Sequence, residues 1–253
     1  MKLMFLGTGT SFGVPQLNCG CEVCRSTDSR DRRQRTSAMV SIAGKNLLID
    51  CGPDFRHQML ENGRPVPDAL LVTHSHYDHL GGIDDLRPYS YVDGGFPIYC
   101  RDDVAQAIHA GMPYCFEPYR YPGAPVLDLH VIDTAPFEVH GIEVMPLPVM
   151  HTATLLITGY RIGGLCYVTD CKTMPQSTIE LMRGADTLVI NALRHEAHDS
   201  HMNLKEAIDV IHAVGPRRAL LTHIAHQMGL YAEVSQMLPK GIELAFDGLA
   251  IEI

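Results

Sequence analysis

The 253-residue sequence has no apolar run near the length that a membrane-spanning helix needs. It also lacks a recognisable secretory signal, since the apolar stretch at residues 3–6 is short and no plausible cleavage site follows it. Positive charge is scarce: the sequence has 20 Lys and Arg residues and 29 Asp and Glu residues, which gives a net charge of −9. We therefore expect a cytoplasmic protein with no membrane partner and no stable nucleic-acid partner.

A linker or shift of composition is also missing, so residues 1–253 are expected to form a single domain. Apolar runs predict strands in both halves, at 3–6, 38–43, 46–50, 69–73, 97–100, 129–133, 142–149, 155–161, 165–169, 187–191 and 218–222. Helices are predicted at 54–60, 102–110, from 204 onward and at 230–238, and Asp247-Gly248 is predicted to join two closing strands. The pattern favours two sheets faced by helices.

What the sequence does contain is a dense group of metal-binding side chains. Residues 73–79 read Thr-His-Ser-His-Tyr-Asp-His and directly follow an apolar run, which indicates a strand that ends in a loop. If this run stays extended, His74, His76 and Asp78 share one face of a strand. A tight turn after His76 would instead leave His74 and His76 as one pair. Asp78 and His79 would then form a second pair. Imidazole and carboxylate suit zinc, manganese or iron, and two such pairs suit a two-metal hydrolytic centre.

Three more candidate ligands each stand where a predicted strand ends, namely His151, Asp170 and His223. Loops at one end of a sheet are where a rigid scaffold collects a site from distant sequence. Singly, each could be an ordinary polar residue at a strand end, but the shared position favours one common site. Asp50, also at a strand end, is a candidate partner for a metal-bound imidazole.

A second group of ligands lies near the start of the chain, where residues 19–24 read Cys-Gly-Cys-Glu-Val-Cys. Three thiols at this spacing can wrap one tetrahedral zinc but need a fourth ligand, and the alternative is a loop with free thiols. Because no secretion signal is recognised, the eight cysteines are interpreted as thiols rather than disulfides.

Three other segments allow two interpretations each. The arginine-rich stretch 25–35 is interpreted as a solvated face, with a phosphate-steering patch as the alternative. The polar residues 7–11 form either an ordinary turn or an anion-binding one. The proline- and aromatic-rich residues 111–125 form either a packed surface loop or a lid that stacks on a sugar or base.

Residues 74–79 resemble the H-x-H-x-D-H signature of the metallo-β-lactamase superfamily, and the resemblance extends over about residues 3–251. It implies an α/β fold, a four-layer αββα sandwich. It also implies two metal sites that share one carboxylate. The implied ligands are His74, His76 and His151 for the first metal, Asp78, His79 and His223 for the second, and Asp170 as the bridge.

Within the superfamily, the chain looks most like the phosphodiesterases of the carbon–phosphorus lyase pathway, which open 5-phosphoribosyl 1,2-cyclic phosphate. The residues that carry this likeness are the C-x-C-x2-C run and the segment 222–227, Thr-His-Ile-Ala-His-Gln. The resemblance implies a structural zinc held by Cys19, Cys21, Cys24 and His226. It places the proposed general acid of that family on His201.

The implied function is hydrolysis of a small phosphodiester, a cyclic ribosyl phosphate being the first choice, with two divalent ions (zinc or manganese) and one structural zinc as cofactors. A metal-bridging hydroxide would attack phosphorus and His201 would protonate the leaving alkoxide. Asp78 is expected also to orient the nucleophile. Thr8, Arg194 and His198 are expected to contact the substrate.

Two alternatives stay open. A thioester or other ester hydrolase would share the metal ligands, although the cysteine site and His201 argue against it. A non-catalytic metal- or RNA-binding module is the remaining class. Hydrolysis of lactams is disfavoured because those members typically lack the histidine that follows Asp78. The sequence leaves open a homodimer and the roles of His195 and His198.

Overall fold

The computed structural model describes residues 1–92, 94–117 and 121–253. Within these ranges the strands form two seven-stranded sheets. The first sheet contains, in spatial order, β14 (Ala250–Glu252), β1 (Lys2–Gly7), β2 (Ser37–Ile42), β3 (Lys45–Ile49), β4 (Ala69–Leu71), β5 (Phe96–Cys100) and β6 (Leu127–Val131). The second contains β13 (Ile242–Leu244), β12 (Arg218–Thr222), β11 (Thr187–Asn191), β10 (Leu165–Val168), β9 (Leu156–Ile162), β8 (Ile142–Met150) and β7 (Phe137–Val139).

The two sheets share one pattern of strand directions. In the first, the pairs from β14 to β3 are antiparallel and those from β3 to β6 are parallel. In the second, the pairs from β7 to β10 are antiparallel and those from β10 to β13 are parallel. The carboxyl ends of parallel neighbours meet at one edge of a sheet, and such an edge is where ligand sites are usually built.

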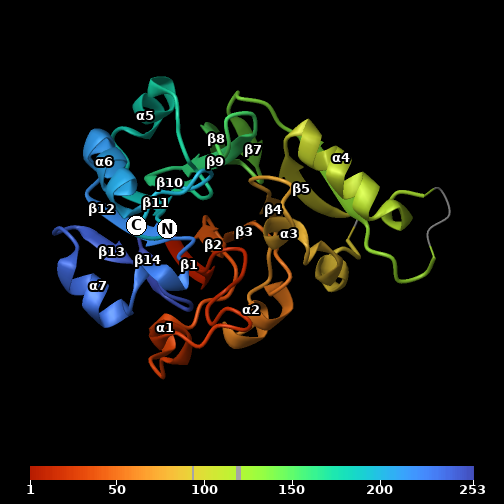
Figure 1. Cartoon of the computed structure of the whole chain (residues 1–253). Coiled ribbons are helices and arrows are strands. Elements are labelled where there is room, and N and C mark those ends of the chain that lie inside the picture. Colours follow the sequence, from red (N-terminus) through yellow and green to blue (C-terminus); the bar gives the residue numbers. More distant parts are fainter. Residues whose placement is uncertain (93, 118–120) are drawn as a thin grey trace.

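Helices cover the outer faces of both sheets. The longer ones are α2 (Phe55–Glu61), α4 (Asp102–Gly111), α5 (Gln176–Met182), α6 (Leu204–Val214) and α7 (Tyr231–Met237). The short ones are α1 (Glu22–Arg25), α3 (Tyr77–Leu80), η1 (Ser29–Asp31), η2 (Ile83–Tyr89), η3 (Pro113–Cys115) and η4 (His226–Met228). In Figure 1, α6 and α7 lie on the left and α4 on the right, with the strands between them.

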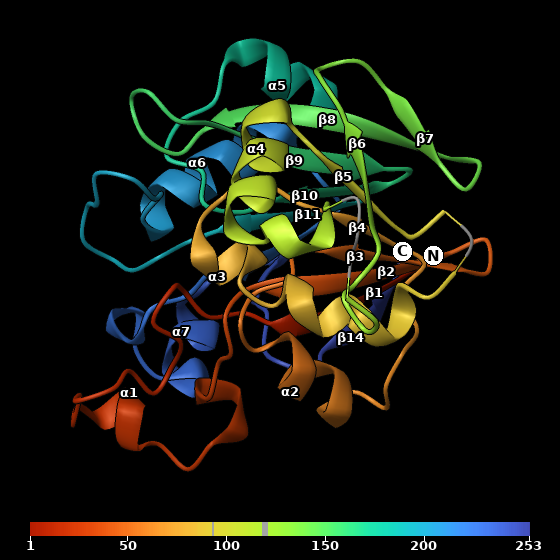
Figure 2. The ribbon, with the colours of Figure 1, turned by 90° about the vertical axis from the view of Figure 1, so that its right-hand side faces the viewer.

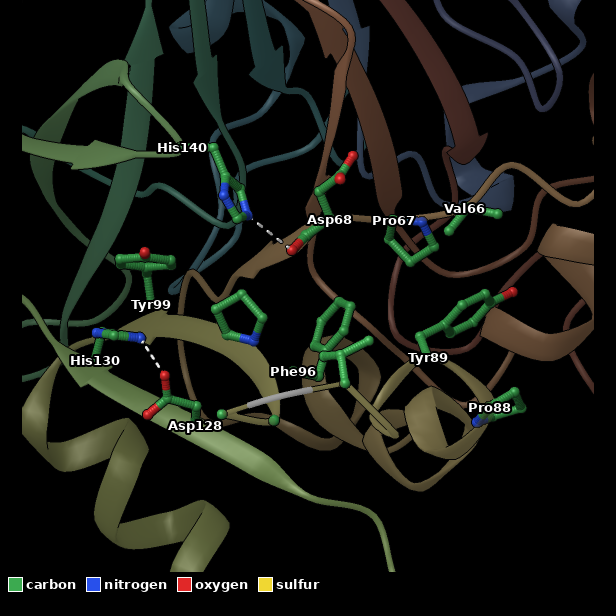
Figure 3. Close-up of a pocket in the computed structure, with 14 residues that line it drawn as sticks. Val66, Pro67, Asp68, Pro88, Tyr89, Phe96, Tyr99, Asp128, His130 and His140 are labelled. Atoms are coloured by element: carbon green, nitrogen blue, oxygen red, sulfur yellow. Dashed lines mark hydrogen bonds and ion pairs between the residues drawn. The ribbon is translucent and has the colours of Figure 1, made fainter.

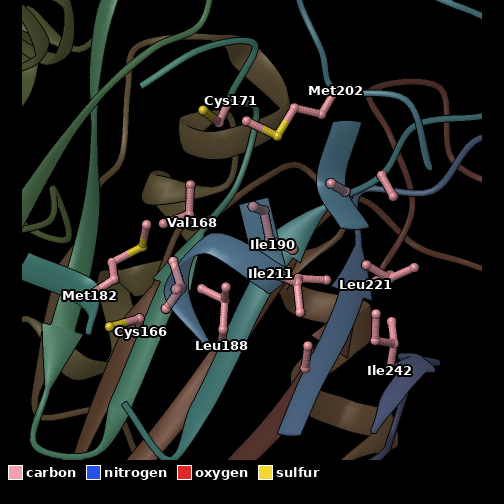
Figure 4. Close-up of a cluster of buried hydrophobic side chains, with 14 of the residues drawn as sticks. Cys166, Val168, Cys171, Met182, Leu188, Ile190, Met202, Ile211, Leu221 and Ile242 are labelled. Carbon is pink, nitrogen blue, oxygen red and sulfur yellow. The ribbon is translucent and has the colours of Figure 1, made fainter. Parts of the chain in front are cut away.

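Three hydrophobic clusters correspond to the three interfaces of a four-layer sandwich. One joins the inner faces of the two sheets and includes Phe5, Ile49, Tyr167 and Val189. The second packs α5, α6 and α7 on the second sheet, and Figure 4 shows Ile211 of α6 beside Leu188, Ile190 and Leu221 of the strands. The third packs α2, η2 and α4 on the first sheet. The αββα sandwich implied by the sequence is therefore confirmed.

Helix α6 illustrates how local sequence signals are realised. The Asn203 side chain accepts a hydrogen bond from the Glu206 N–H, and the Glu206 carboxylate accepts one from the Asn203 N–H, which forms a capping box. The helix ends at Gly215, whose φ of 69° is the left-handed conformation that glycine adopts without strain. The predicted start of this helix is confirmed.

Several local predictions were wrong. The two closing strands do not form a hairpin, because β13 belongs to the second sheet and β14 pairs with β1 of the first. Asp54 does not cap α2 with its side chain, because its carboxylate binds the Arg35 backbone N–H and guanidinium instead. Arg33 is not part of a solvated face: it is buried and donates to Thr8 Oγ1 and the Ala245 carbonyl.

The sequence analysis did not predict β7, α5 or the short helix α3. For residues 111–125, the described side chains Tyr114 and Phe116 pack against the first-sheet cluster, which favours the packed loop over the lid. Residues 118–120 of that segment lie outside the described residues. The chain ends meet where the Met1 ammonium donates to the Ile253 carbonyl (Figures 1 and 2). Among the described residues, no helix is long and apolar enough to cross a bilayer.

The capping box of α6 yields a stability test. Asn203→Ala removes the acceptor for the Glu206 N–H and is expected to lower the free energy of unfolding by about 1 kcal/mol, as measured by denaturant titration. Lys205→Ala, in the same helical turn, removes only an exposed ion pair with Asp209 and is the matched control. Equal losses in the two variants would contradict the capping account.

Candidate metal centre

The sequence allowed two arrangements of the histidine-rich run, and the structure has the one with a turn after His76. His76 has extended backbone angles and helix α3 begins at the next residue, so the chain turns sharply between the two pairs. His74, His76 and His151 form one group of metal-binding atoms, all within 4.8 Å of one another. A second group meets the same limit and consists of Asp78, His79, Asp170 and His223.

Asp170 lies between the two groups. Its Oδ1 is 3.3 Å from His79 Nε2, and its Oδ2 is 3.1 Å from His223 Nε2 and 4.0 Å from His74 Nε2. The side chain is almost completely buried, with the residue 1% exposed. The Asp170 carboxylate therefore belongs to one donor group and lies next to the other.

The backbone at the strand ends is strained where it presents these groups. Asp50, Asp170 and His223 follow β3, β10 and β12, and their φ angles are 59°, 53° and 55°. Side chains other than glycine rarely adopt this left-handed region, which costs about 1–3 kcal/mol per residue. Such strain persists only where the surrounding structure fixes it, and it is concentrated here at the candidate site.

Buried groups behind the ligands hold them in place. Asp50 Oδ2 accepts a hydrogen bond from His79 Nδ1 at 2.7 Å, which leaves Nε2 of that ring directed at the cluster. Asp50 also accepts from the backbone N–H and the hydroxyl of Thr73. Asp50 therefore plays the supporting role that its place at a strand end indicated.

Two further supports were missed from the sequence. The Thr169 hydroxyl donates to Asp170 Oδ1 at 2.6 Å. Asn191 binds both the N–H and the carbonyl of Cys171, which fixes the turn that carries Asp170. Thr169 follows β10 directly and Asn191 is the last residue of β11. Only the order of strands in the sheet shows that β11 brings Asn191 next to β10.

The donor atoms fit a divalent metal. Among the described residues, His74 Nε2, His79 Nε2 and His223 Nε2 are buried without a hydrogen-bond partner, which is costly unless a cation completes them. Although burial opposes it, the pKa of His79 is raised well above its usual value by Asp170, Asp50 and Asp78. The cluster thus favours positive charge at its centre, and the imidazole and carboxylate donors suit zinc, manganese or iron.

His201 reaches the same centre from the loop before α6. Its Nε2 lies 3.1 Å from Asp170 Oδ2, and its ring stacks on that of His223 with the centroids 4.8 Å apart. Burial lowers the pKa of His201 to about 4. His151, Asp170 and His201 also form a group that could hold an ion, so both a proton-transfer role and a ligand role are geometrically open to His201.

The residues expected to contact substrate fall in different places. His198 Nδ1 lies 3.3 Å from His201 Nδ1, so it joins the centre through that ring. Arg194 donates to the Ala197 carbonyl within the same loop. The Thr8 side chain is fully buried and binds Asp247 and Arg33, so it is not offered to a substrate. The predicted contact between Thr8 and the substrate was wrong, because the Thr8 hydroxyl accepts a hydrogen bond from the buried Arg33 guanidinium instead.

The three cysteines meet a histidine from the far end of the chain. Cys21 Sγ is 3.2 Å and Cys19 Sγ 3.7 Å from His226 Nδ1, and Cys24 completes the group within 4.8 Å. The Cys24 backbone N–H, together with His226, lowers the pKa of Cys21 to about 6, which favours the thiolate that metals bind. Three thiols and one imidazole suit a closed tetrahedral zinc site.

A large groove lies elsewhere and contains none of the predicted site residues. It measures about 710 Å³ and is lined mostly by residues that precede β4 and β5 or begin β5 (Figure 3). Figure 3 shows His130 paired with Asp128 and His140 directed at the Asp68 carbonyl. Both histidines of the groove are thus already partnered, and its described residues form no group of metal-binding side chains.

Comparison with known proteins agrees with this geometry. Residues 45–224 match the family described as the Beta-lactamase superfamily domain, which covers most of the chain. The chain belongs to the metallo-β-lactamase superfamily. The crystal structure of a diphosphatase of the PhnP family has a TM-score of 0.91 and 37% identity, over 99% of this chain and 96% of that one. The superfamily fold and the His/Asp donor groups together identify a metal-dependent hydrolase.

Two other proteins are also similar to this chain. An octanoyltransferase of Porphyromonas gingivalis is 41% identical over 98% of this chain, but the chain spans only 51% of that protein. Zinc-bound PqqB of Methylobacterium extorquens has a TM-score of 0.82 at 22% identity over the full length of both chains, which shows a shared fold.

The metal-ligand assignments predict loss of metal. His74→Ala or Asp170→Ala removes one donor and is expected to lower bound metal and to reduce hydrolysis of an activated phosphodiester to background, as measured by elemental analysis and turnover on the same preparation. Gln176→Ala, an exposed helix residue on α5, is the control. Unchanged turnover in either ligand variant would contradict the two-metal interpretation.

The cysteine site predicts a different phenotype. Cys21→Ser should lose one metal per chain and melt at a lower temperature, because the site joins residues 205 apart in sequence and metal binding then adds to folding stability. Catalysis per folded molecule should survive better than in His74→Ala. A metal count equal to that of the unaltered protein would reject the site.

Proposed function

We propose that this chain is a metal-dependent phosphodiesterase that hydrolyses a small phosphodiester, with a cyclic ribosyl phosphate as the first candidate. The observation that carries the proposal is the buried Asp170 carboxylate between two groups of metal donors. Two-metal centres of this kind stabilise both the attacking and the leaving oxygen of a displacement at phosphorus. The PhnP-family diphosphatase, 37% identical over nearly the whole chain, supports chemistry at phosphorus.

The two donor groups would hold two divalent cations, zinc or manganese. Such cations lower the pKa of a bound water and offset charge on phosphoryl oxygens. The residues of the chain then have separate tasks. Asp78, held 3.2 Å from His79 Nε2, is placed to orient the attacking water towards phosphorus.

His201 is the proposed proton donor to the leaving oxygen. The Ser200 hydroxyl lies 2.9 Å from its Nδ1, which fixes the ring so that Nε2 faces the centre. Burial lowers the pKa of His201, but an anionic phosphoryl group beside the ring favours the protonated imidazole. As the phosphorus–oxygen ester bond breaks, the Nε2 proton passes to the leaving alkoxide, and the ring is left neutral.

Acyl ester or thioester hydrolysis is the second candidate. The observation in its favour is the 41% identity to a protein named octanoyltransferase. This chain matches only 51% of that protein. The same two donor groups could polarise a thioester carbonyl. An octanoyl thioester is therefore the diagnostic acyl substrate.

A substrate panel tests the proposal directly. Purified protein, with metal content measured, is assayed on 5-phosphoribosyl 1,2-cyclic phosphate, a nucleoside 2′,3′-cyclic phosphate, a diphosphate diester and an octanoyl thioester, each with added zinc or manganese. We expect the cyclic phosphodiesters to have the highest kcat/KM. Turnover of the thioester alone would replace the proposal with the acyl hydrolase. Failure on every substrate, with metals bound, would favour a non-catalytic metal-binding module.

The role of His201 predicts a dependence on the leaving group. His201→Ala should keep both metals and lose about 10²–10⁴-fold in kcat on a ribosyl substrate, whose leaving oxygen needs a proton. On a nitrophenyl diester the loss should be much smaller, because phenolate is stable without one. Equal losses would indicate a binding role, and lost metal would make His201 a ligand. His195→Ala is the matched control, since His195 Nε2 donates to the Met228 carbonyl, away from the centre.

A further inference from the structure

The loop before α6 contains a second histidine, His198, that the proposed chemistry does not use. The His198 ring is partly buried, and its Nδ1 lies 3.3 Å from the Ser200 backbone nitrogen, 3.2 Å from the Ser200 hydroxyl and 3.3 Å from His201 Nδ1. On its other side, the His201 ring lies 3.1 Å from Asp170 Oδ2 through Nε2. An unbroken series of contacts therefore runs from His198 through Ser200 and His201 to the metal centre.

The directions of these hydrogen bonds follow from one group whose role is fixed. A backbone N–H can only donate, so His198 Nδ1 accepts a hydrogen bond from the Ser200 N–H and itself carries no hydrogen. The Ser200 hydroxyl, which faces the same Nδ1, therefore donates to it as well. Because its hydrogen is used in this way, Ser200 Oγ is an acceptor towards His201 Nδ1, 2.9 Å away. It follows that His201 carries a hydrogen on Nδ1.

The opposite set of directions would leave lone pairs facing each other. If the Ser200 hydroxyl donated to His201 Nδ1, that nitrogen would carry no hydrogen and would lie 3.3 Å from His198 Nδ1, which carries none either. Ser200 Oγ would also direct a lone pair at His198 Nδ1. Acceptors in contact repel each other, and mismatched contacts within a partly buried polar network are costly. His198 thus favours the form of His201 that has a hydrogen on Nδ1.

The Ser200 carbonyl holds a different ring. A carbonyl can only accept, so His151 Nδ1 donates to it at 2.9 Å, which leaves His151 Nε2 free for the first group of metal donors. The backbone of Ser200 thus orients a candidate metal ligand, whereas its hydroxyl orients the proposed proton donor. His198 contacts the hydroxyl and the backbone N–H but forms no printed bond with His151. A change at His198 is therefore expected to disturb His201 and to spare the metal ligands.

We propose that His198 is a positioning residue for proton transfer: through the Ser200 hydroxyl it keeps a hydrogen on His201 Nδ1 and holds His201 Nε2 towards the reacting centre. This inference rests on the proposed function, in which Nε2 of His201 gives its proton to the leaving oxygen. That step breaks the Nε2–H bond and leaves the remaining ring hydrogen on Nδ1. This is the form that His198 favours, so the ring needs no rearrangement after the transfer.

Nitrogen NMR tests the position of the hydrogen without turnover. On zinc-loaded protein, long-range proton–nitrogen spectra distinguish a ring nitrogen that carries a hydrogen from one that does not, and His201→Gln identifies the His201 signals. We expect a hydrogen on His201 Nδ1 in the unaltered protein and in His198→Asn, whose Oδ1 retains an acceptor. His198→Ala should shift His201 towards the tautomer with its hydrogen on Nε2. A His201 Nδ1 without hydrogen in the unaltered protein, or an unchanged tautomer in His198→Ala, would overturn the proposal.

Kinetics with two leaving groups test the consequence for catalysis. His198→Ala should lower kcat on 5-phosphoribosyl 1,2-cyclic phosphate about tenfold, as expected for one lost hydrogen bond, with KM and bound metal unchanged. On a nitrophenyl diester, whose leaving group needs no proton, kcat should stay close to that of the unaltered protein. His198→Asn should recover most of the loss. Glu196→Ala, at an exposed position of the same loop, is the control and should alter neither kcat.

Three results would overturn the positioning role. Equal losses of kcat on the two substrates would show that His198 does not act through the proton donor. A rise in KM alone would make His198 a substrate contact, and lost metal would make it part of the metal site. If the unaltered protein hydrolyses no ribosyl substrate but the NMR result holds, the proposed function fails while the effect of His198 on His201 stands.

Discussion

The structure depends on keeping a cluster of acids and imidazoles out of water at the edge where the two sheets end. Asp170 is the centre of this cluster: it is buried, yet it contacts His79, His201 and His223 and lies within 4.0 Å of His74. Buried charges are tolerated only when they are paired or bind metals. The strained backbone at the strand ends and the buried supports, Asp50 and Thr169, all serve to hold these donors together.

The same constraint links the two metal-binding groups of the chain. The loop that precedes α6 binds the centre through His201 and contacts η4 through His195, whose Nε2 donates to the Met228 carbonyl. His226, in that same short helix, faces the cysteines from the first strand's loop. A metal held by Cys19, Cys21, Cys24 and His226 would join the segment after β1 to η4.

Much of this arrangement could be predicted from the sequence, because ligand types and strand ends are local signals. The turn after His76 and the strand-end positions of His151, Asp170 and His223 are examples. The predictions that were wrong are ones that depend on contacts between residues far apart in the sequence. Nothing local distinguishes a hairpin across Asp247 from a crossing between sheets, and the burial of Arg33 follows only from its contacts with Thr8 and Ala245. Thr8 was assigned to substrate for the same reason, since its partners lie far away in sequence.

The central claim is that Asp170 joins two metals, with a third metal at the cysteines. Anomalous X-ray diffraction from crystals grown with zinc, with data collected on both sides of the zinc absorption edge, tests it most directly. The account predicts three peaks per chain, one on each side of the Asp170 carboxylate and one among Cys19, Cys21, Cys24 and His226. A single peak near Asp170, or none, at full occupancy of the cysteine site would contradict the two-metal centre.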